Sequence, residues 1–538
     1  MQGVIIVEFA SVKELVITRG TQYRGKIFLS SPEDGVDLTY DAYLLAVRRL
    51  AKALLALGMR KGERVALLMA NGLNYAVTFT GVMASGGVVV PINPHLKPAE
   101  VTRLLGDAGT SLVLTDDGWY RVFYPLLKGL PVRRLDLGLP GGRLLALEMA
   151  SGSKGDDRTV EASPPGRNDL ALLLYTSGTT GKPKGVMLTH GNLLAEARYI
   201  QKGHRLTPED TALCILPLYH INGEVVTLIT PIFSGGRVVM PHKFRASRFW
   251  DWVRNYRVTW FSAVPTILSI LLSHPLPDRS ALSSLRFARS ASAPLPVAVL
   301  REFEARFAVP VIEAYGLSET ASQVTTNPLP PAVRKPGSVG LPVGNQVRVV
   351  NENGETVPAG VTGEVVVRGE NVCRGYFHNE EATAASFKGG WFYTGDLGYL
   401  DADGYLFLTG RSKELINRGG EKFSPREIDE ILYRLPEVEL AAAVGVPDPL
   451  YGEEVVAFIQ LRPGKSLAED RVISFLRDYL ADFKVPREVI FIRDFPRGPN
   501  GKIQRLKLVD LYLKKFQGVA HGAGAGTRSI NGEEVAER

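Results

Sequence analysis

Residues suited to bind a polyphosphate are concentrated between positions 176 and 184, directly after the apolar run 170–174. Hydroxyls and glycines there leave backbone N–H groups open to phosphate oxygens, and lysines balance the negative charge. The pattern is not Walker A, because the position five before Gly181 is Thr176 and Lys182 is followed by proline. A plain surface turn needs only one or two glycines, so this segment predicts a phosphate-binding loop. Its residues are Thr176, Ser177, Gly178, Thr179, Thr180, Gly181, Lys182 and Lys184.

Later segments carry residue types that suit a nucleotide and a metal ion. Tyr315 is followed by Gly316, so an aromatic ring can cover a base while glycine permits close approach. Glu319 offers a carboxylate, and Mg²⁺ prefers one or two carboxylates together with phosphate oxygens. Asp396 offers another carboxylate, suited to accept hydrogen bonds from ribose hydroxyls. Each segment alone is equally typical of a strand end or a turn, and Lys502, beside a glycine, is by itself typical of a solvated turn.

Together and in this order, the segments resemble the signature of the acyl-adenylate-forming superfamily, which includes acyl-CoA synthetases, beetle luciferases and peptide-synthetase adenylation domains. The resemblance covers most of residues 165–510. A lone histidine is more often structural, and the resemblance alone gives His220 a role as a gate between the acid pocket and the nucleotide. The other roles implied are adenine binding for Tyr315 and Gly316, α-phosphate binding for Ser318, Mg²⁺ binding for Glu319, ribose binding for Asp396 and Arg411, and catalysis for Lys502 with Thr176, His220 and Glu319.

The same resemblance implies two reactions at one site. ATP and a carboxylic acid first give acyl-AMP and pyrophosphate, and CoA then takes the acyl group as a thioester. The thiol must reach the acyl carbon where Lys502 stood before, which implies a C-terminal module that swings about Lys413 and presents Gly419 and Gly420 to the pantetheine arm of CoA. The predicted function is therefore an AMP-forming carboxylic acid–CoA ligase with ATP, Mg²⁺ and CoA as cofactors.

The identity of the acid is harder to predict. Segments 335–340 and 414–422 resemble the oxalyl-CoA synthetase branch most closely. Where that branch carries a second histidine after the gate histidine, this chain has Asn222, and where it carries a histidine after the metal glutamate, this chain has Ser322. Without these imidazoles a second carboxylate loses its partners, which predicts a fatty or aromatic monocarboxylic acid and leaves oxalate as an alternative; Arg289 does not decide between them. The residues expected to line the acid pocket are His220, Asn222, Ser290, Ser292 and Ser322.

Two other classes of protein stay open. The acyl-AMP could pass to an amine or to a carrier-protein thiol, as in standalone adenylation enzymes. A nucleotide-binding regulator without turnover is a poorer match, because it would need neither Lys502 nor Glu319. The net charge is +7, but Lys and Arg are spread along the chain rather than gathered in a stripe, which argues against a nucleic-acid partner. A homodimer is a further alternative to a monomer.

The elements that must position these residues alternate between helix and strand. Apolar residues recur at helical spacing over 44–57, with Gly58 as a C-cap, and strand patterns follow at 64–69 and 87–91. This alternation predicts an α/β fold with parallel sheets. The expected architecture is a large N-terminal domain (1–412) of two parallel α/β subdomains, divided near 151–169, plus a small β-barrel-like subdomain over 337–410. A small mobile α+β C-terminal domain (413–516) and a disordered tail (517–538) complete it. A capping box is expected at Ser424–Glu427.

Composition sets the remaining bounds. Of the 538 residues, 45% are hydrophobic and 22% charged, which is typical of a globular protein with more than one core. The two cysteines, Cys214 and Cys373, stand in apolar settings without a CxxC motif, which predicts a reducing compartment. The first residues lack the basic start and long apolar run of a signal peptide, and no apolar stretch reaches the length of a membrane span. These features predict a cytoplasmic protein.

Overall fold

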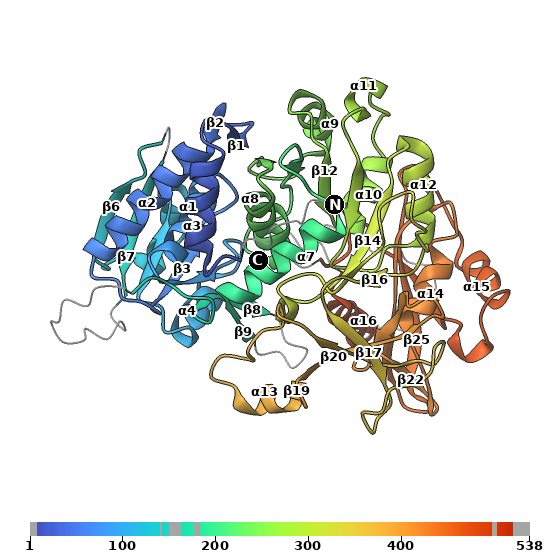
Figure 1. Cartoon of the computed structure of the whole chain (residues 1–538). Coiled ribbons are helices and arrows are strands. Elements are labelled where there is room, and N and C mark those ends of the chain that lie inside the picture. Colours follow the sequence, from blue (N-terminus) through green and yellow to red (C-terminus); the bar gives the residue numbers. More distant parts are fainter. Residues whose placement is uncertain (1–7, 140–141, 150–162, 177–182, 498–502, 520–538) are drawn as a thin grey trace.

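The computed structural model describes residues 8–139, 142–149, 163–176, 183–497 and 503–519. Its first sheet forms the lobe at the left of Figure 1, and its four inner strands run parallel. These inner strands are almost wholly buried, as expected for a parallel sheet covered on both faces. In spatial order the strands are β6 (Val132–Asp136), β7 (Arg143–Glu148), β5 (Leu112–Thr115), β3 (Arg64–Leu68), β4 (Val88–Pro91), β8 (Leu170–Thr176) and β9 (Lys184–Thr189).

The second sheet has six parallel strands at its centre and antiparallel strands at both edges. One face packs against α9 (Ala246–Asn255), α10 (Pro265–Leu272) and α12 (Val297–Phe307), and the other against α7 (His190–Gly203), the π-helix η1 (Asn222–Ile229) and α8 (Thr230–Ser234). In spatial order the strands are β16 (Leu341–Pro342), β15 (Thr325–Thr326), β14 (Val311–Tyr315), β13 (Phe287–Ser290), β12 (Trp260–Ala263), β10 (Thr211–Leu213), β11 (Arg237–Val239), β1 (Ile27–Ser31) and β2 (Val36–Thr39).

The two large sheets exchange their edges. Strands β1 and β2 come from the first 40 residues but complete the second sheet, while β8 and β9, which follow residue 169, complete the first. The predicted division of the two subdomains near 151–169 is therefore wrong at both ends. A strand joins whichever sheet edge is open beside it, and sequence order alone does not settle which edge that is.

Helices cover the first sheet and link the lobes. Helix α2 begins after Thr39, whose hydroxyl accepts from the Ala42 N–H, and ends just before Gly58, which has a left-handed φ of +82°. This confirms the predicted C-cap. Helix α3 is buried on nearly every side, because it lies inside the core shared by α1, α2 and η1. The helices of this part are α1 (Val12–Gln22), α2 (Tyr40–Ala56), α3 (Leu73–Ala84), α4 (Pro98–Asp107), α5 (Asp117–Val122) and α6 (Tyr124–Leu127).

A small antiparallel unit follows the second sheet, as predicted. Its strands β20 and β21 bring the paired residues Asp396 and Arg411 beside Tyr315, the last residue of β14. Short helices α11 (Arg279–Leu282) and α13 (Glu380–Ser386) lie in the connections before and within this part. The strands are β17 (Gln346–Val350), β18 (Gly363–Arg368), β19 (Phe387–Lys388), β20 (Trp391–Leu400) and β21 (Leu406–Arg411).

The C-terminal region forms its own five-stranded sheet, at the lower right of Figure 1. One face packs on α14 (Pro425–Leu432) and α15 (Glu469–Arg477) and the other on α16 (Arg505–Val519). A large N-terminal domain with parallel sheets and a smaller α+β C-terminal domain confirm the predicted fold class. Helix α16 continues three residues past the predicted domain end at 516. The strands are β22 (Ile416–Arg418), β23 (Glu421–Phe423), β24 (Val438–Asp448), β25 (Gly452–Leu461) and β26 (Glu488–Phe491).

The start of α14 corrects one local prediction. Ser424 is the N-cap and Pro425 is the first helical residue, as the sequence indicates, but the Ser424 hydroxyl accepts from the Arg426 N–H. The Glu427 carboxylate accepts from the Lys484 ammonium instead of returning to the cap. The capping box is therefore not formed, because a cationic partner on a neighbouring segment binds the glutamate more strongly than a backbone amide.

Two observations bear on the predicted cellular location. Cys214 and Cys373 are both buried free thiols. Among the described residues, no helix combines the length and the apolar character needed to cross a membrane.

Gly340 lies where the second sheet contacts the antiparallel unit, and its substitution tests how closely the two parts pack. It bridges to Leu406 with a φ of +88°, and a Cβ there would lie 2.0 Å from the Thr326 carbonyl carbon. Gly360 has a similar φ of +81° but open space around it. We expect Gly340→Ala to lower the free energy of unfolding by about 3–5 kcal/mol and Gly360→Ala by about 1 kcal/mol. Calorimetric unfolding midpoints of the two variants check this, and equal shifts would contradict it.

Candidate functional site

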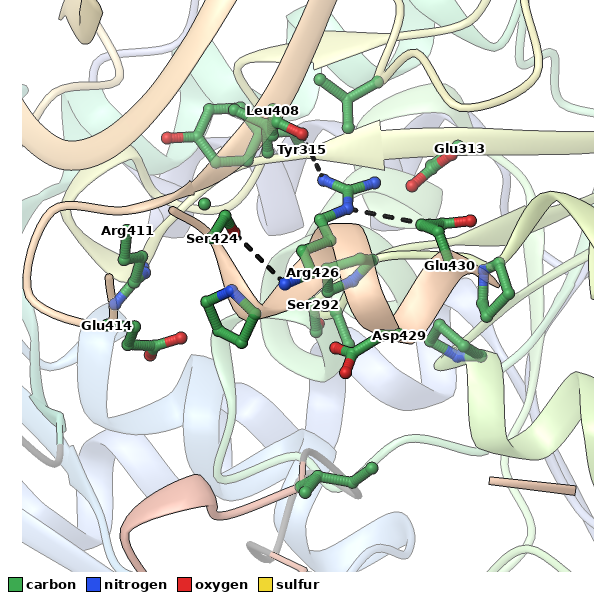
Figure 2. A pocket seen from close by; sticks show the side chains of 18 of the residues that line it. Ser292, Glu313, Tyr315, Leu408, Arg411, Glu414, Ser424, Arg426, Asp429 and Glu430 are labelled. Atoms are coloured by element: carbon green, nitrogen blue, oxygen red, sulfur yellow. Dashed lines mark hydrogen bonds and ion pairs between the residues drawn. The ribbon is translucent and has the colours of Figure 1, made fainter. Parts of the chain in front are cut away.

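A cavity lies where the second sheet, the antiparallel unit and the C-terminal domain meet (Figure 2). The walls that the N-terminal domain supplies are the end of β14, the turn after β13 and the facing ends of β20 and β21. Its remaining wall comes from α14, where Arg426, Asp429 and Glu430 lie across from Tyr315 (Figure 2). The carboxyl ends of parallel strands in an open α/β sheet are the usual position of a ligand crevice.

Three predicted site residues contact one another in this wall. Tyr315, the last residue of β14, donates its hydroxyl to Asp396 Oδ2 at 2.6 Å. Arg411 Nε lies 2.6 Å from Asp396 Oδ1, and the two residues are register partners on β20 and β21. Burial would lower the pKa of Arg411, but Asp396 and Glu414 beside it raise that pKa overall. The result is a fixed carboxylate whose remaining lone pairs can accept from hydroxyls, next to an aromatic ring.

Gly316 is required by close packing. A Cβ at this position would lie 1.4 Å from the Ser322 carbonyl oxygen, so no other residue fits without moving the backbone. The chain then turns through η2 (Ser318–Thr320), and Ala321 and Ser322 take positive φ values of 53° and 131°. Non-glycine residues in such conformations store strain that the surrounding packing must hold, and they are concentrated at functional sites.

Glu319 has the environment of a metal ligand. Its carboxylate accepts a hydrogen bond from the Tyr376 hydroxyl at 2.9 Å, and it makes no ion pair with any described residue. Burial raises its pKa, because a carboxylate held away from water lacks stabilisation of its charge. No group of three or more His, Cys, Asp or Glu side chains able to hold a metal by themselves exists among the described residues. A single carboxylate beside a phosphate site suits Mg²⁺, which takes phosphate oxygens and waters as its other ligands.

Only the two ends of the predicted phosphate loop lie within the described residues. Thr176 ends β8 and Lys184 begins β9 as its register partner, and the Lys184 ammonium lies 4.8 Å from the centre of the Tyr376 ring. Tyr376 therefore links the base of this loop to Glu319. Sequence reasoning missed Tyr376, and nothing in the surrounding segment, Cys373-Arg374-Gly375-Tyr376, pointed to this role. Ser177, Gly178, Thr179, Thr180, Gly181, Lys182 and Lys502 lie outside the described residues.

Of the predicted acid-pocket residues, Ser292 lines the cavity, and Asn222 is hydrogen-bonded to it. His220 Nε2 is buried without a hydrogen-bond partner among the described residues, and burial lowers the pKa of the ring to about 4, so the imidazole is neutral at pH 7. Asn222 begins η1, and its Nδ2 donates to Ser292 Oγ at 3.1 Å. Ser292 lines the cavity, whereas the buried Ser290 hydroxyl finds no described partner. Ser322 is buried one turn beyond η2.

Arg289 is the residue that sequence reasoning left undecided. It lies on β13 with 1% of its surface exposed, and its guanidinium donates to Ser262 Oγ at 3.0 Å and to Asn222 Oδ1 at 3.2 Å. A weaker contact of 3.4 Å reaches Gln323 Oε1. A charged residue inside the short apolar strand 287–290 was the signal that could have drawn attention to it.

The predicted CoA loop lies away from the cavity. Gly419 and Gly420 form the turn between β22 and β23, both with positive φ, and the Gly419 N–H donates to the Tyr451 carbonyl at 2.8 Å. Lys413 lies between β21 and β22, where the chain passes from one domain to the other. Ile503 and Arg505, by contrast, line the cavity. The structure thus brings the residues after position 502 to the cavity and leaves the glycine turn outside it.

Comparison with known proteins gives matches along nearly the whole chain. Residues 17–377 match the AMP-binding enzyme family and residues 427–502 match the AMP-binding enzyme C-terminal domain. A sulfoacetate–CoA ligase of Cupriavidus necator is 43% identical, with 93% of this chain and 98% of that protein covered. An oxalate–CoA ligase of Arabidopsis thaliana is 39% identical, with 85% and 90% covered. The crystal structure of ATP-bound MatB from Rhodopseudomonas palustris has a TM-score of 0.83 at 31% identity, with 94% and 100% covered.

Glu196 on α7 gives the site a measurable pH dependence. Burial raises the pKa of Glu196 to about 8, while an unfolded glutamate titrates near 4.3. Between these values the folded protein holds a proton that the unfolded chain has lost, so stability falls as pH rises from about 5 to 8. We expect Glu196→Gln to remove this fall, which amounts to at most about 1.4 kcal/mol per pH unit. Unfolding midpoints between pH 5 and 9 measure it.

The matched control is Glu381→Gln, an exposed glutamate on α13. Its pH profile should run parallel to that of the wild type. A Glu196→Gln profile that also runs parallel would show that Glu196 is ionised in the folded protein.

Proposed function

The chain belongs to the AMP-binding enzyme family and is an AMP-forming acid–CoA ligase that uses ATP, Mg²⁺ and CoA. From this premise we propose that both half-reactions take place at the cavity beside the end of β14. The observation that carries the proposal is the contact between Tyr315, Asp396 and Arg411. It fixes a carboxylate for the ribose hydroxyls beside an aromatic ring for the base. Gly316, the next residue, lets the Ser322 backbone pack against the end of β14 and so holds the turn to Glu319 beside that ring.

The first half-reaction joins two anions. A carboxylate oxygen of the acid attacks the α-phosphorus, and pyrophosphate leaves with the electron pair. The barrier is mainly electrostatic, so fixed cations and donors around the phosphates lower it. Thr176, Ser318, Lys184 and the loop between Thr176 and Lys184 supply donors, and Lys502 supplies a cation at the reacting centre. Glu319 would hold Mg²⁺, which would supply positive charge to the phosphate oxygens.

In the second half-reaction the CoA sulfur attacks the acyl carbon, the thiol proton is lost, and AMP leaves. The thiol needs the space that Lys502 fills in the first half-reaction. A C-terminal domain (413–516) that turns about Lys413 removes Lys502 and brings Gly419 and Gly420 to the pantetheine arm. The absence of side chains on these two residues leaves room for that arm. The domain boundaries (1–412, 413–516, 517–538) belong to this proposal.

The present arrangement suits the first half-reaction. Ile503, next to Lys502, lines the cavity with Tyr315, while Gly419 lies outside it. Among the described residues, the polar contacts between the two domains include the pair of Arg462 with Glu302 of α12 at 3.0 Å, the bond from Arg426 to the Leu408 carbonyl at 2.7 Å, and the bond that Glu430 accepts from the Val297 N–H. Partly exposed pairs of this kind contribute little stability, so they suit a domain that must leave.

Two finer features stay predictions. A homodimer is proposed as the alternative to a monomer, and light scattering would decide. A cytoplasmic location is proposed from the buried free thiols Cys214 and Cys373, which suit a reducing compartment.

The function is tested by acid-dependent release of AMP from ATP, with and without CoA, across a panel from oxalate to long-chain and aryl acids. We expect AMP and thioester to form together with one class of acid. AMP or pyrophosphate release that ignores CoA but responds to added amine would identify an amide ligase instead.

The two half-reactions can be separated by mutation. We expect Lys502→Ala to slow acyl-AMP formation by about 10²–10³-fold, because a fixed cation at the reacting centre is lost. Thioester formation from supplied acyl-AMP and CoA should stay within a few-fold of wild type. Isotope exchange between pyrophosphate and ATP measures the first step, and thioester absorbance the second.

Gly420→Leu should show the opposite pattern, with exchange retained and thioester formation slowed. Its control is Gly464→Leu, which has a positive φ of 74° and open space in the same domain but lies far along the chain from the CoA turn. If Gly420→Leu and Gly464→Leu behave alike, the assignment of the turn to CoA is wrong.

A further inference from the structure

A cation is buried beside the acid pocket without an anionic partner. The Arg289 guanidinium is almost fully enclosed, and no carboxylate of the described residues forms an ion pair with it. Its acceptors are neutral: the hydroxyl of Ser262 and the side-chain carbonyls of Asn222 and Gln323. Buried charges in proteins are normally paired, because removal from water is costly for an isolated ion. This cation is therefore an unusual feature that calls for an anion.

Arg289 is one side chain away from the cavity. Asn222 accepts from Arg289 through Oδ1 and donates through Nδ2 to Ser292, which lines the cavity. These contacts place the guanidinium behind Asn222 and Ser292, on the side of Ser292 away from the cavity. An anion that replaces Asn222 Oδ1 on the guanidinium would receive the N–H groups of Arg289 and remain beside Ser262 and Ser292.

The nearest carboxyl does not remove the charge. Glu196 acts on Arg289 from a distance, and its two oxygens accept from the Gln323 backbone N–H and the Asn371 side chain. Burial raises the pKa of Glu196 to about 8, so the carboxyl is mainly protonated at pH 7. The cluster around Arg289 then has a net positive charge in the resting protein.

The polar groups around the Arg289 guanidinium also argue against a long apolar acid that extends to this place. An alkyl chain or aryl ring at this place would press against Ser262, Asn222 and a guanidinium, and would remove their hydrogen bonds without replacing them. Buried polar groups that lose their partners cost free energy, and a site built from such groups rejects a ligand that lacks the matching polar group.

We infer that the acid substrate is short and carries a second anionic group, a carboxylate or a sulfonate, which Arg289 binds. This rests on the proposed function, because it assigns the acid of the same first half-reaction. The reacting carboxylate faces the α-phosphate, and the second anion points away from it toward β13. The guanidinium offers several fixed N–H donors, which match a carboxylate or a sulfonate in a bidentate arrangement.

This assignment reverses the preference drawn from the sequence. Asn222 and Ser322 do stand where imidazoles would be expected for a second carboxylate, but a guanidinium from the neighbouring strand β13 supplies the missing charge. Arg289 stays protonated at any physiological pH, whereas the nearby His220 ring is neutral.

The first experiment compares matched acids with the wild-type enzyme. Oxalate, malonate, succinate and sulfoacetate carry the second anion; acetate, propionate, butyrate, octanoate, benzoate and monomethyl malonate lack it. We expect kcat/KM for at least one dianionic acid to exceed that for its partner without the second anion by about 10–100-fold, because hydrogen bonds to a charged group are stronger than those between neutral groups. The preferred dianion distinguishes carboxylate from sulfonate recognition.

The second experiment removes the cation. Arg289→Met keeps the length of the side chain, Arg289→Lys keeps the charge, and Arg301→Met changes an exposed arginine on α12 as the control. We expect Arg289→Met to lower kcat/KM for the dianion by about 10–100-fold while KM for ATP and activity on the short monocarboxylates stay near wild type. Arg289→Lys should recover part of the loss, and Arg301→Met should change nothing.

The outcomes separate this inference from the proposed function. Wild-type preference for octanoate, benzoate or the monoester, with thioester formed, would overturn the second-anion assignment and leave the ligase intact. No AMP release with any acid would overturn the ligase itself. If Arg289→Met fails to fold, the wild-type comparison of malonate with monomethyl malonate still decides, and equal rates would overturn the assignment.

Discussion

The site depends on holding charges away from water. Arg289, Glu196 and Glu313 are buried and Glu319 is partly buried. Burial keeps Glu196 mainly protonated at pH 7, so Arg289 is a buried charge surrounded by neutral groups, and only Glu319 is expected to meet a metal ion. A buried charge is tolerated when neutral dipoles surround it at fixed positions, because any movement exposes an unpaired group. The sheet provides that rigidity, since its side chains are anchored on strands that are hydrogen-bonded on both sides. Chemistry that joins two anions gains from such a fixed field, which need not reorganise during the reaction.

The proposed domain rotation needs one wall of the cavity that can move while the others stay fixed. The walls that hold charge, from β12 to β14 and from β20 to β21, belong to continuous sheets, whereas the wall that carries Ile503 is attached by a single strand connection and a few polar contacts. Interfaces between domains that are small and polar permit relative motion. The packing of the two parts is therefore consistent with the proposed rotation of the C-terminal domain.

Much of this could be predicted from sequence, and the limits have physical causes. The parallel α/β class, the antiparallel unit after 337 and the small C-terminal domain follow from local periodicity, which strands and helices record directly. The exchange of β1 and β8 between sheets could not be predicted, because pairing partners depend on which edges are open in three dimensions. The capping box at Ser424 failed for a similar reason: a distant lysine, Lys484, competes for Glu427.

The candidate site likewise contains residues that the sequence predicted and residues that it did not. Tyr315, Asp396 and Arg411 were named from short motifs, and the structure brings them into contact, although their roles are still proposals. Tyr376 and the importance of Arg289 escaped, because neither stands in a motif and both act through contacts across the fold.

The acid pocket shows why matching residue types position by position can mislead. A second anion does not need histidine at a given position; it needs positive charge and donors within reach, and any nearby strand can supply them. Asn222 of η1 and Ser322 after η2 stand where histidines would be expected, but Arg289 on β13 carries a buried positive charge. The charge available to a second anion depends on all three positions together. Since Arg289 is cationic and its hydrogen-bond acceptors are neutral, the electrostatics beside Ser292 favour a dianionic acid even though the sequence, read along the motifs, favours a neutral tail.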